Sequence, residues 1–222
     1  MRYLDLLTAL FATVLLVSNV ASTKLVVLGP FTFDGGTLLF PLAYIFGDVL
    51  TEVYGYRKSR RVICIGFFAL LLATLTFQAV AHLPAPPDAE SQRFGEAFGL
   101  LLGLTPRIVL GSLLAYFLGE FANAYVLAKL KVRTEGRFFW LRALASTLVG
   151  QGLDTGVFLL VAFYGVFPKE VLLAVFLSNY AFKLGVEALM LPFTYAVVGF
   201  LKRAEGMDAY DRDTDFNPFR LT

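Results

Sequence analysis

The amino-acid sequence predicts an all-α integral membrane protein with six transmembrane helices, and three observations carry this prediction. First, 58% of the 222 residues are hydrophobic and 16% are charged, with a mean hydropathy of +0.71. Soluble domains are about half apolar and a quarter charged. Second, six apolar segments reach or exceed the length of about 20 residues that crosses the hydrocarbon core of a bilayer. Third, basic residues are divided unevenly between the two sides that six spans define.

The six predicted spans cover residues 3–22, 37–56, 61–81, 106–128, 139–163 and 169–201, and the last is long enough to tilt or to project into water. Their alternation places 14 of the 19 lysines and arginines on the side of both termini and four on the opposite side, while Lys183 lies within the last span. Cytoplasmic loops carry the excess of basic residues, so both termini are expected to be cytoplasmic. The apolar N-terminal run has a poor cleavage site for a signal peptide and is expected to be retained.

Three segments outside these spans have expected structures of their own. Residues 24–36 alternate turn residues with short β-prone pieces, which is typical of a small external hairpin or a re-entrant lid. Residues 91–104 show helical periodicity, which indicates an amphipathic helix at the outer surface. Residues 205–222 are acidic and poor in large apolar side chains, so we expect a flexible cytoplasmic tail after a transmembrane domain of residues 1–204.

The predicted second span contains two carboxylates, Asp48 and Glu52, which are four residues apart and share one face of a helix. A charged side chain at the bilayer centre costs roughly 2.5 to 3.5 kcal/mol on insertion scales, so such residues usually face a protein interior or a watery cavity. Gly47 permits a close approach of another helix beside Asp48. We therefore expect this helix in the middle of the bundle, next to a polar cavity.

The later spans repeat this spacing of polar residues at three or four positions, so at least four helices are expected to turn a polar face toward a common interior. Hydrogen bonding between helices is the structural alternative. Intramembrane contacts of that kind contribute about 0.6 kcal/mol each, which poorly explains five carboxylates beside one lysine. The candidate substrate-binding residues are Asn19, Asp48, Glu52, Glu120, Asn123, Gln151, Asp154, Asn179, Lys183 and Glu187.

Carboxylates and amides among apolar and aromatic side chains suit a small, planar, nitrogen-rich ligand. A carboxylate accepts two parallel hydrogen bonds from N–H groups, whereas Asn and Gln both donate and accept. The same carboxylates could instead carry protons that drive transport, and the sequence does not separate the two roles.

Other classes of protein find little support in the sequence. The chain contains one histidine and one cysteine, and it has no hydrolase, zinc-protease or phosphate-loop motif. We expect no enzyme activity, no cofactor and no metal site; an intramembrane aspartyl enzyme that uses Asp48 and Asp154 is the remaining alternative. The formal charge of +2 gives no reason to expect a nucleic-acid partner.

Three stretches resemble a known family. Residues 40–56 read FPLAYIFGDVLTEVYGY and precede a basic segment, residues 145–155 read ASTLVGQGLDT, and residues 179–183 read NYAFK. These stretches resemble the queuosine precursor transporter family, also called vitamin uptake transporters, and the resemblance extends from about residue 19 to residue 200.

The resemblance implies a carrier of the bacterial inner membrane that takes up 7-deazaguanine precursors of queuosine, chiefly 7-cyano-7-deazaguanine and 7-aminomethyl-7-deazaguanine. The family also resembles the membrane-embedded subunits of energy-coupling-factor transporters, so a binding subunit for a vitamin-like molecule that needs an energising partner is the alternative. The sequence leaves open the preferred deazapurine, the coupling ion and whether two copies form a homodimer. By motif match, the implied pocket residues are Asp48, Glu52, Gln151, Asp154, Asn179 and Lys183.

Overall fold

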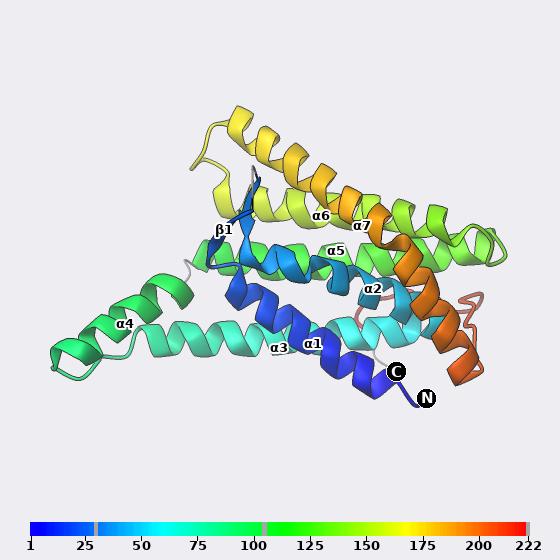
Figure 1. Cartoon of the computed structure of the whole chain (residues 1–222), viewed down its shortest axis with the longest axis horizontal. Helices are drawn as coiled ribbons and strands as arrows, with labels where there is room; N and C mark the ends of the chain where they lie inside the picture. The colour runs from blue at the N-terminus through cyan, green and yellow to red at the C-terminus, as the bar shows by residue number, and fades with distance from the viewer. Residues whose placement is uncertain (29–30, 104–105, 221–222) are drawn as a thin grey trace.

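The computed structural model describes residues 1–28, 31–103 and 106–220. Figure 1 shows the long helices side by side in a bundle, with α4 projecting at one end and both termini at the other. The elements in chain order are α1 (Leu4–Ala21), β1 (Leu25–Leu28), β2 (Phe31–Asp34), the 3₁₀ helix η1 (Gly35–Leu39), α2 (Phe40–Tyr54), α3 (Tyr56–Ala81), α4 (Ala89–Leu102), α5 (Pro106–Arg133), α6 (Phe139–Phe163) and α7 (Lys169–Glu205).

Within the described residues, five helices, α1, α3, α5, α6 and α7, are long and apolar enough to cross a membrane, which confirms a helical multi-pass membrane protein. The second predicted span, residues 37–56, is instead divided mainly between η1 and α2. Because α2 has 15 residues, it is roughly 22 Å long, which is shorter than a hydrocarbon core of about 30 Å. The count of six spans and the cytoplasmic side of the termini therefore stay predictions.

The short helix α2 lies inside the bundle, where it contacts α1, α3, α5 and α7. Its side chains Val49, Leu50 and Val53 are each at most 1% exposed. Because protein surrounds α2, the carboxylates of Asp48 and Glu52 are also held away from lipid, each with 1% exposure. The interior position expected for this helix is confirmed.

The helices α5 and α6 approach one another most closely through two glycines. A Cβ atom added at Gly119 would lie 3.0 Å from the carbonyl oxygen of Gly150, and one added at Gly150 would lie 2.9 Å from that of Gly119. Larger side chains would force the backbones apart. The glycines therefore set the spacing of the helices at the level of Asn123 and Asp154, whose Cβ atoms lie against them.

The helix α7 continues for 37 residues and contains Pro192. A proline inside a helix removes one backbone hydrogen bond and displaces the preceding turn, which bends the helix. Figure 1 shows the C-terminal half of α7 turning toward the two termini. In this position Lys202 comes within 2.7 Å of the Glu52 carboxylate on α2.

The two predicted external segments have the expected secondary structure. The strands β1 and β2 form an antiparallel hairpin that pairs Leu25 with Asp34 and Val26 with Phe33. The helix α4 begins after Asp88, whose carboxylate accepts a 2.8 Å hydrogen bond from the Ser91 backbone. This bond lowers the pKa of Asp88, and no residue of α4 is buried. Residue 104, the expected end of that helix, lies outside the described residues.

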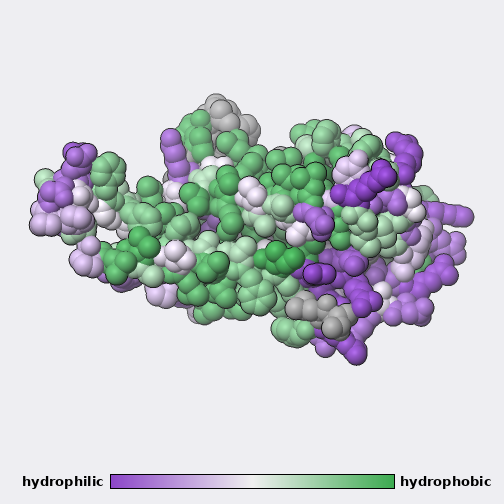
Figure 2. Space-filling view, turned by 90° about the horizontal axis from the view of Figure 1, so that it is seen from below, coloured by the Kyte–Doolittle hydropathy of each residue, from purple (hydrophilic) through white to green (hydrophobic). Residues whose placement is uncertain are grey.

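The surface divides into a hydrophobic belt and polar ends. Figure 2 shows hydrophobic residues covering the middle of the bundle and hydrophilic residues gathered at its right-hand end and at the tip of α4. The right-hand end is formed by the beginnings of α3 and α6 and by the ends of α5 and α7, where the sequence places most of its basic residues (Figure 1). A single band of this kind is what a bilayer requires of an embedded protein.

Candidate functional site

Glu52 lies in a buried cluster of ions between α2, α5, α6 and α7. The Arg142 guanidinium donates to both of its carboxylate oxygens, at 2.5 and 3.2 Å, and Lys202 Nζ donates to one of them at 2.7 Å. Lys131 Nζ lies 3.5 Å from the carboxylate and donates to the Glu52 backbone carbonyl at 2.5 Å. We call these four residues the Glu52 ion cluster. Three cations therefore surround the Glu52 carboxylate, and two of them, Lys131 and Lys202, also contact Asp208, so this closed network of ions suits a structural role.

The sequence did not reveal the partners of Glu52. Lys131, Arg142 and Lys202 were assigned to loops at the basic end by the distribution of charges. Only Arg142 gave a local signal, since it lies inside the predicted span 139–163 and is fully buried in the structure. A basic residue within an apolar helix needs a carboxylate nearby, so the position of Arg142 was the signal from which an interior ion pair could have been predicted.

The chain after α7 continues over the same end of the bundle. Asp211, which is 7% exposed, accepts a 2.9 Å hydrogen bond from the Tyr56 backbone and so caps the beginning of α3. The Ala209 backbone N–H donates to the carbonyl of Val53 at 3.2 Å. Gly55 joins α2 to α3 with a φ of 81°, and a Cβ atom there would lie 3.1 Å from that of Ala209. The segment is therefore fitted closely to this junction.

Further contacts attach the same segment to α3 and α5. The Phe216 ring lies 4.8 Å from the Tyr56 ring and 5.2 Å from the Tyr125 ring, while Arg60 donates to two backbone carbonyls of the segment. Burial alone would raise the pKa of Asp208, but hydrogen bonds from Lys131 and Lys202 outweigh burial and lower it. The domain boundary near residue 205 and the flexibility of this tail stay predictions, although these contacts favour a packed segment.

Replacing Asp211 by alanine is expected to lower the free energy of unfolding by about 1 kcal/mol, because the first turn of α3 loses its capping acceptor. Thermal unfolding of the detergent-purified protein measures the change. The matched control is Asp213→Ala, which removes the same charge from an exposed position of the same segment. Equal stability of the two variants would show that the cap contributes nothing.

A second polar cluster lies deeper in the bundle and contains a pair of carboxyl groups. Asp48 on α2 and Glu187 on α7 are each 1% exposed and lie within hydrogen-bonding reach of each other. Asn123 on α5 also hydrogen-bonds Asp48. One oxygen of each carboxyl, Asp48 Oδ2 and Glu187 Oε2, has no hydrogen-bond partner among the residues that the structure describes.

An ion pair between α6 and α7 extends this cluster. Lys183 Nζ donates to Asp154 Oδ2 at 2.8 Å and to Thr155 Oγ1 at 3.3 Å. Glu120 on α5 lies in the electrostatic field of both Asp154 and Lys183. A Cβ atom at Gly47 would lie 3.7 Å from Glu120, so this carboxylate also faces α2 beside Asp48. We call the joined set the central polar cluster: Asp48, Glu120, Asn123, Asp154, Lys183 and Glu187.

The remaining sequence-predicted residues differ in position. Gln151 lies on α6, next to Gly150 and one turn before Asp154, and Gly150 packs on Asn123. The Oε1 atom of Gln151 is buried and has no hydrogen-bond partner among the described residues. Asn179 lies one turn before Lys183 and is exposed. Asn19 is separate, since it lines a cavity of about 100 Å³ together with residues of α1, α3 and α4.

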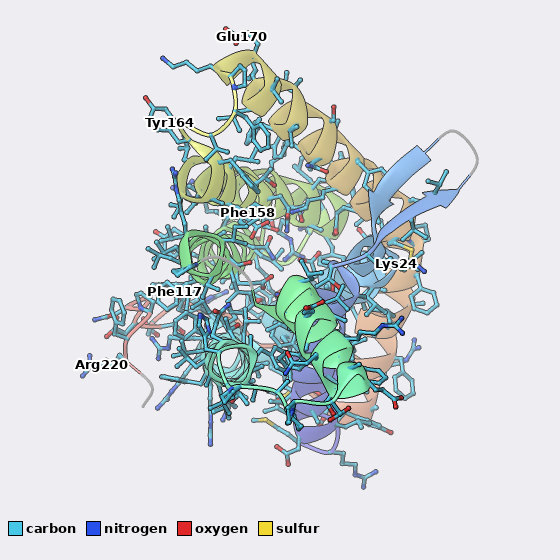
Figure 3. The ribbon with its side chains drawn as sticks, turned by 90° about the vertical axis from the view of Figure 1, so that its left-hand side faces the viewer. Lys24, Phe117, Phe158, Tyr164, Glu170 and Arg220 are labelled. Carbon is cyan, nitrogen blue, oxygen red and sulfur yellow. The ribbon has the colours of Figure 1, made fainter. Side chains whose placement is uncertain are left out.

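Seen along the bundle, side chains fill the space between α5, α6 and α7, while Lys24 before the hairpin and Arg220 near the C-terminus lie on opposite sides (Figure 3). Asp48, Glu52 and Glu187 therefore lie in the protein interior, between helices whose outer faces are hydrophobic (Figure 2), whereas Asp154 is 30% exposed. Buried ionisable groups inside membrane helices are typical of substrate and ion pathways. The fold and the site together define a multi-pass membrane protein with the features of a transporter.

The chain belongs to the family described as "Putative vitamin uptake transporter", which it matches over residues 34–197. It is 36% identical over 188 residues to the "Probable queuosine precursor transporter" of Bacillus subtilis (strain 168), covering 84% of this chain and 80% of that protein. It is also 27% identical over 168 residues to the "Queuosine precursor transporter" of Escherichia coli (strain K12), covering 73% of this chain and 71% of that protein. No solved structure matches the chain. The family indicated by the sequence is confirmed.

Proposed function

We propose that this protein imports 7-deazaguanine precursors of queuosine, 7-cyano-7-deazaguanine and 7-aminomethyl-7-deazaguanine, across the bacterial inner membrane. The names of its curated relatives support the class of substrate. The structural observation that carries the proposal is a group of four buried oxygen atoms without hydrogen-bond partners among the described residues. They are Asp48 Oδ2, Asn123 Oδ1, Gln151 Oε1 and Glu187 Oε2.

All four atoms are hydrogen-bond acceptors. Leaving such a group buried and unpaired costs about 1 to 3 kcal/mol, so a ligand that donates hydrogen bonds to these oxygens removes that cost when it binds. The guanine-like edge of a 7-deazaguanine presents a ring N–H and an amino group in parallel, and its pyrrole ring carries a further N–H. A carboxylate such as Asp48 accepts the parallel pair with two hydrogen bonds.

The positions of the candidate residues suggest different parts in binding. We place Asp48, Asn123, Gln151 and Glu187 against the donor edge of the base. Glu120, Asp154 and Lys183 surround it, and the Lys183 ammonium is a donor for the carbonyl oxygen of the base. Asn179 is exposed one turn along α7, where it could meet substrate on entry. Glu52 and Asn19 are left out of the contact set, because the structure pairs Glu52 with three cations and places Asn19 in another cavity.

The orientation proposed for the protein follows from its charges. The end that holds both termini also holds the basic beginnings and ends of the long helices (Figure 1). We assign this end to the cytoplasm because cytoplasmic loops of membrane proteins are enriched in lysine and arginine. The proposal involves transport only, with no reaction, cofactor or metal. One copy of the chain suffices for it, and the homodimer finds no support in the structure.

Ligand binding is tested by thermal unfolding of the detergent-purified protein in the presence of both deazaguanines, guanine, riboflavin and biotin. A ligand that binds only the folded protein raises its stability by about 2.7 kcal/mol at a hundredfold excess over the dissociation constant. We expect this stabilisation with the deazaguanines. Stabilisation by a vitamin alone would overturn the proposed substrate, and stabilisation by none of the compounds would overturn the proposed site.

The sequence leaves a second candidate, a binding subunit for a vitamin-like molecule that needs an energising partner, and the family description names a vitamin as the substrate. Purified protein reconstituted alone into liposomes separates the two functions. Uptake of labelled 7-cyano-7-deazaguanine by the single chain would support the carrier. Binding of the compound without uptake would support the binding subunit.

A further inference from the structure

The carboxyl pair of Asp48 and Glu187 has no cation beside it among the described residues. The groups that act on Asp48 are Glu187, Asn123 and Glu52, and the side chain that acts on Glu187 is Asp48. Cations elsewhere in the interior have carboxylates of their own. Lys183 is bonded to Asp154, and the three cations of the Glu52 ion cluster surround Glu52.

The other polar groups around the pair come from every helix that packs on α2 and α7 at this level. The helices α1 and α3 place no charged residue among the groups that act on either carboxyl. The remaining groups are Glu120 and Asn123 from α5, Gln151 and Asp154 from α6, Lys183 from α7 and Glu52 from α2 itself. Glu52 has its own three cations, so among the other charged groups of this set two carboxylates, Glu120 and Asp154, stand against one ammonium, that of Lys183, which is bonded to Asp154.

Two carboxyl groups in this arrangement hydrogen-bond only if one of them carries a proton, since a carboxylate has acceptors and no donor. Two negative charges side by side, each 1% exposed, would repel one another without solvent to screen them. A single proton shared by the pair satisfies the hydrogen bond and removes one of the charges. The protein itself therefore supplies a binding site for one proton.

We propose that the Asp48–Glu187 pair binds one transported proton, and that release of this proton into the cytoplasm drives uptake of the substrate through the central polar cluster. This inference rests on the proposed function. The proton reaches a carboxylate oxygen from the outer side and forms the carboxyl that bridges α2 and α7. When the two helices separate toward the cytoplasm, the O–H bond breaks, the proton leaves to water and the carboxylate is restored. Pro192 lies five residues after Glu187 and weakens α7 where such a movement would begin.

Proton binding is tested first without substrate. An infrared titration of the reconstituted protein follows the C=O absorption of protonated carboxyl groups as the pH rises. We expect one protonated carboxyl to be lost from the spectrum of both Asp48→Asn and Glu187→Gln at neutral pH. Glu96→Gln, an exposed carboxyl on α4, is the matched control and should keep the signal. A signal that is unchanged in both variants of the pair would overturn the proton site.

Coupling is tested in liposomes that contain the purified protein and a labelled 7-cyano-7-deazaguanine. The measured quantity is the ratio of accumulation driven by a pH gradient to exchange between labelled and unlabelled substrate without a gradient. We expect Glu187→Gln to lower this ratio at least tenfold and Glu96→Gln to leave it unchanged. A wild-type protein that exchanges substrate but ignores the gradient would overturn the coupling alone. Absence of both binding and exchange would overturn the proposed function, while the infrared result would still decide whether the pair holds a proton.

Discussion

Replacing Asp48 by alanine is expected to reduce uptake of 7-cyano-7-deazaguanine at least about 100-fold. The variant loses the carboxylate that we place against two parallel N–H donors, and each hydrogen bond to a charged group contributes about 1.5 to 3 kcal/mol. Two such bonds together exceed the 2.7 kcal/mol that a hundredfold change in affinity requires. Uptake by liposomes that contain equal amounts of folded protein measures the loss.

The control for this experiment is Asp48→Asn, which keeps the volume of the side chain and one acceptor but removes the charge. We expect an intermediate loss of about tenfold, since one uncharged hydrogen bond remains. Gel filtration of both variants in detergent shows whether they insert and fold. Normal uptake by a folded Asp48→Ala protein would exclude this carboxylate from the site.

Helical periodicity was sufficient to predict most of the central polar cluster. Glu120 and Asn123 lie three residues apart and both face α2 beside Gly47, as a shared helical face requires. Asp154 and Lys183 were assigned to different helices facing one interior, and the structure joins them in a 2.8 Å ion pair. Periodicity identifies the face of a helix, and in a bundle the polar faces must meet because the outer faces meet lipid.

Periodicity does not identify the depth at which a residue meets its partners. Asp48 and Glu52 share one face of α2 and are separated by one turn, roughly 6 Å along the helix axis. That turn divides two environments, since Glu52 lies among Lys131, Arg142 and Lys202, whereas Asp48 lies beside another carboxyl. The register between α2 and the other helices decides this difference, and a single sequence contains no direct signal of register.

Contacts between distant parts of the chain also could not be predicted from the sequence. The tail was expected to be flexible because its composition is acidic and poor in apolar groups. The flexibility of the tail stays a prediction, but its composition gives no sign of the specific partners of its aspartates, since Asp211 caps α3 and Asp208 contacts two lysines. Hydropathy also does not decide whether residues 37–56 cross the membrane, because a short helix buried by other helices is as apolar as one that faces lipid.

Replacing Glu52 by glutamine is expected to destabilise the protein by about 3 to 5 kcal/mol, which is the usual cost of removing one partner from a buried ion pair. The variant leaves Arg142, which is fully buried, without the carboxylate that neutralises it, and it removes one of the two carboxylates beside Lys131. Chemical unfolding of the purified protein in detergent measures the change, and Glu96→Gln on the exposed face of α4 is the matched control.

Adding Arg142→Met to the Glu52 variant tests whether the loss comes from unpaired charge. The double variant should be more stable than the sum of the two single changes, since removing both partners leaves no uncompensated guanidinium. This outcome would assign Glu52 to the structural framework that holds α2 against α6 and α7. A Glu52→Gln protein as stable as the wild type but unable to bind a deazaguanine would contradict that assignment, and it would return Glu52 to the substrate-binding residues that the sequence predicts.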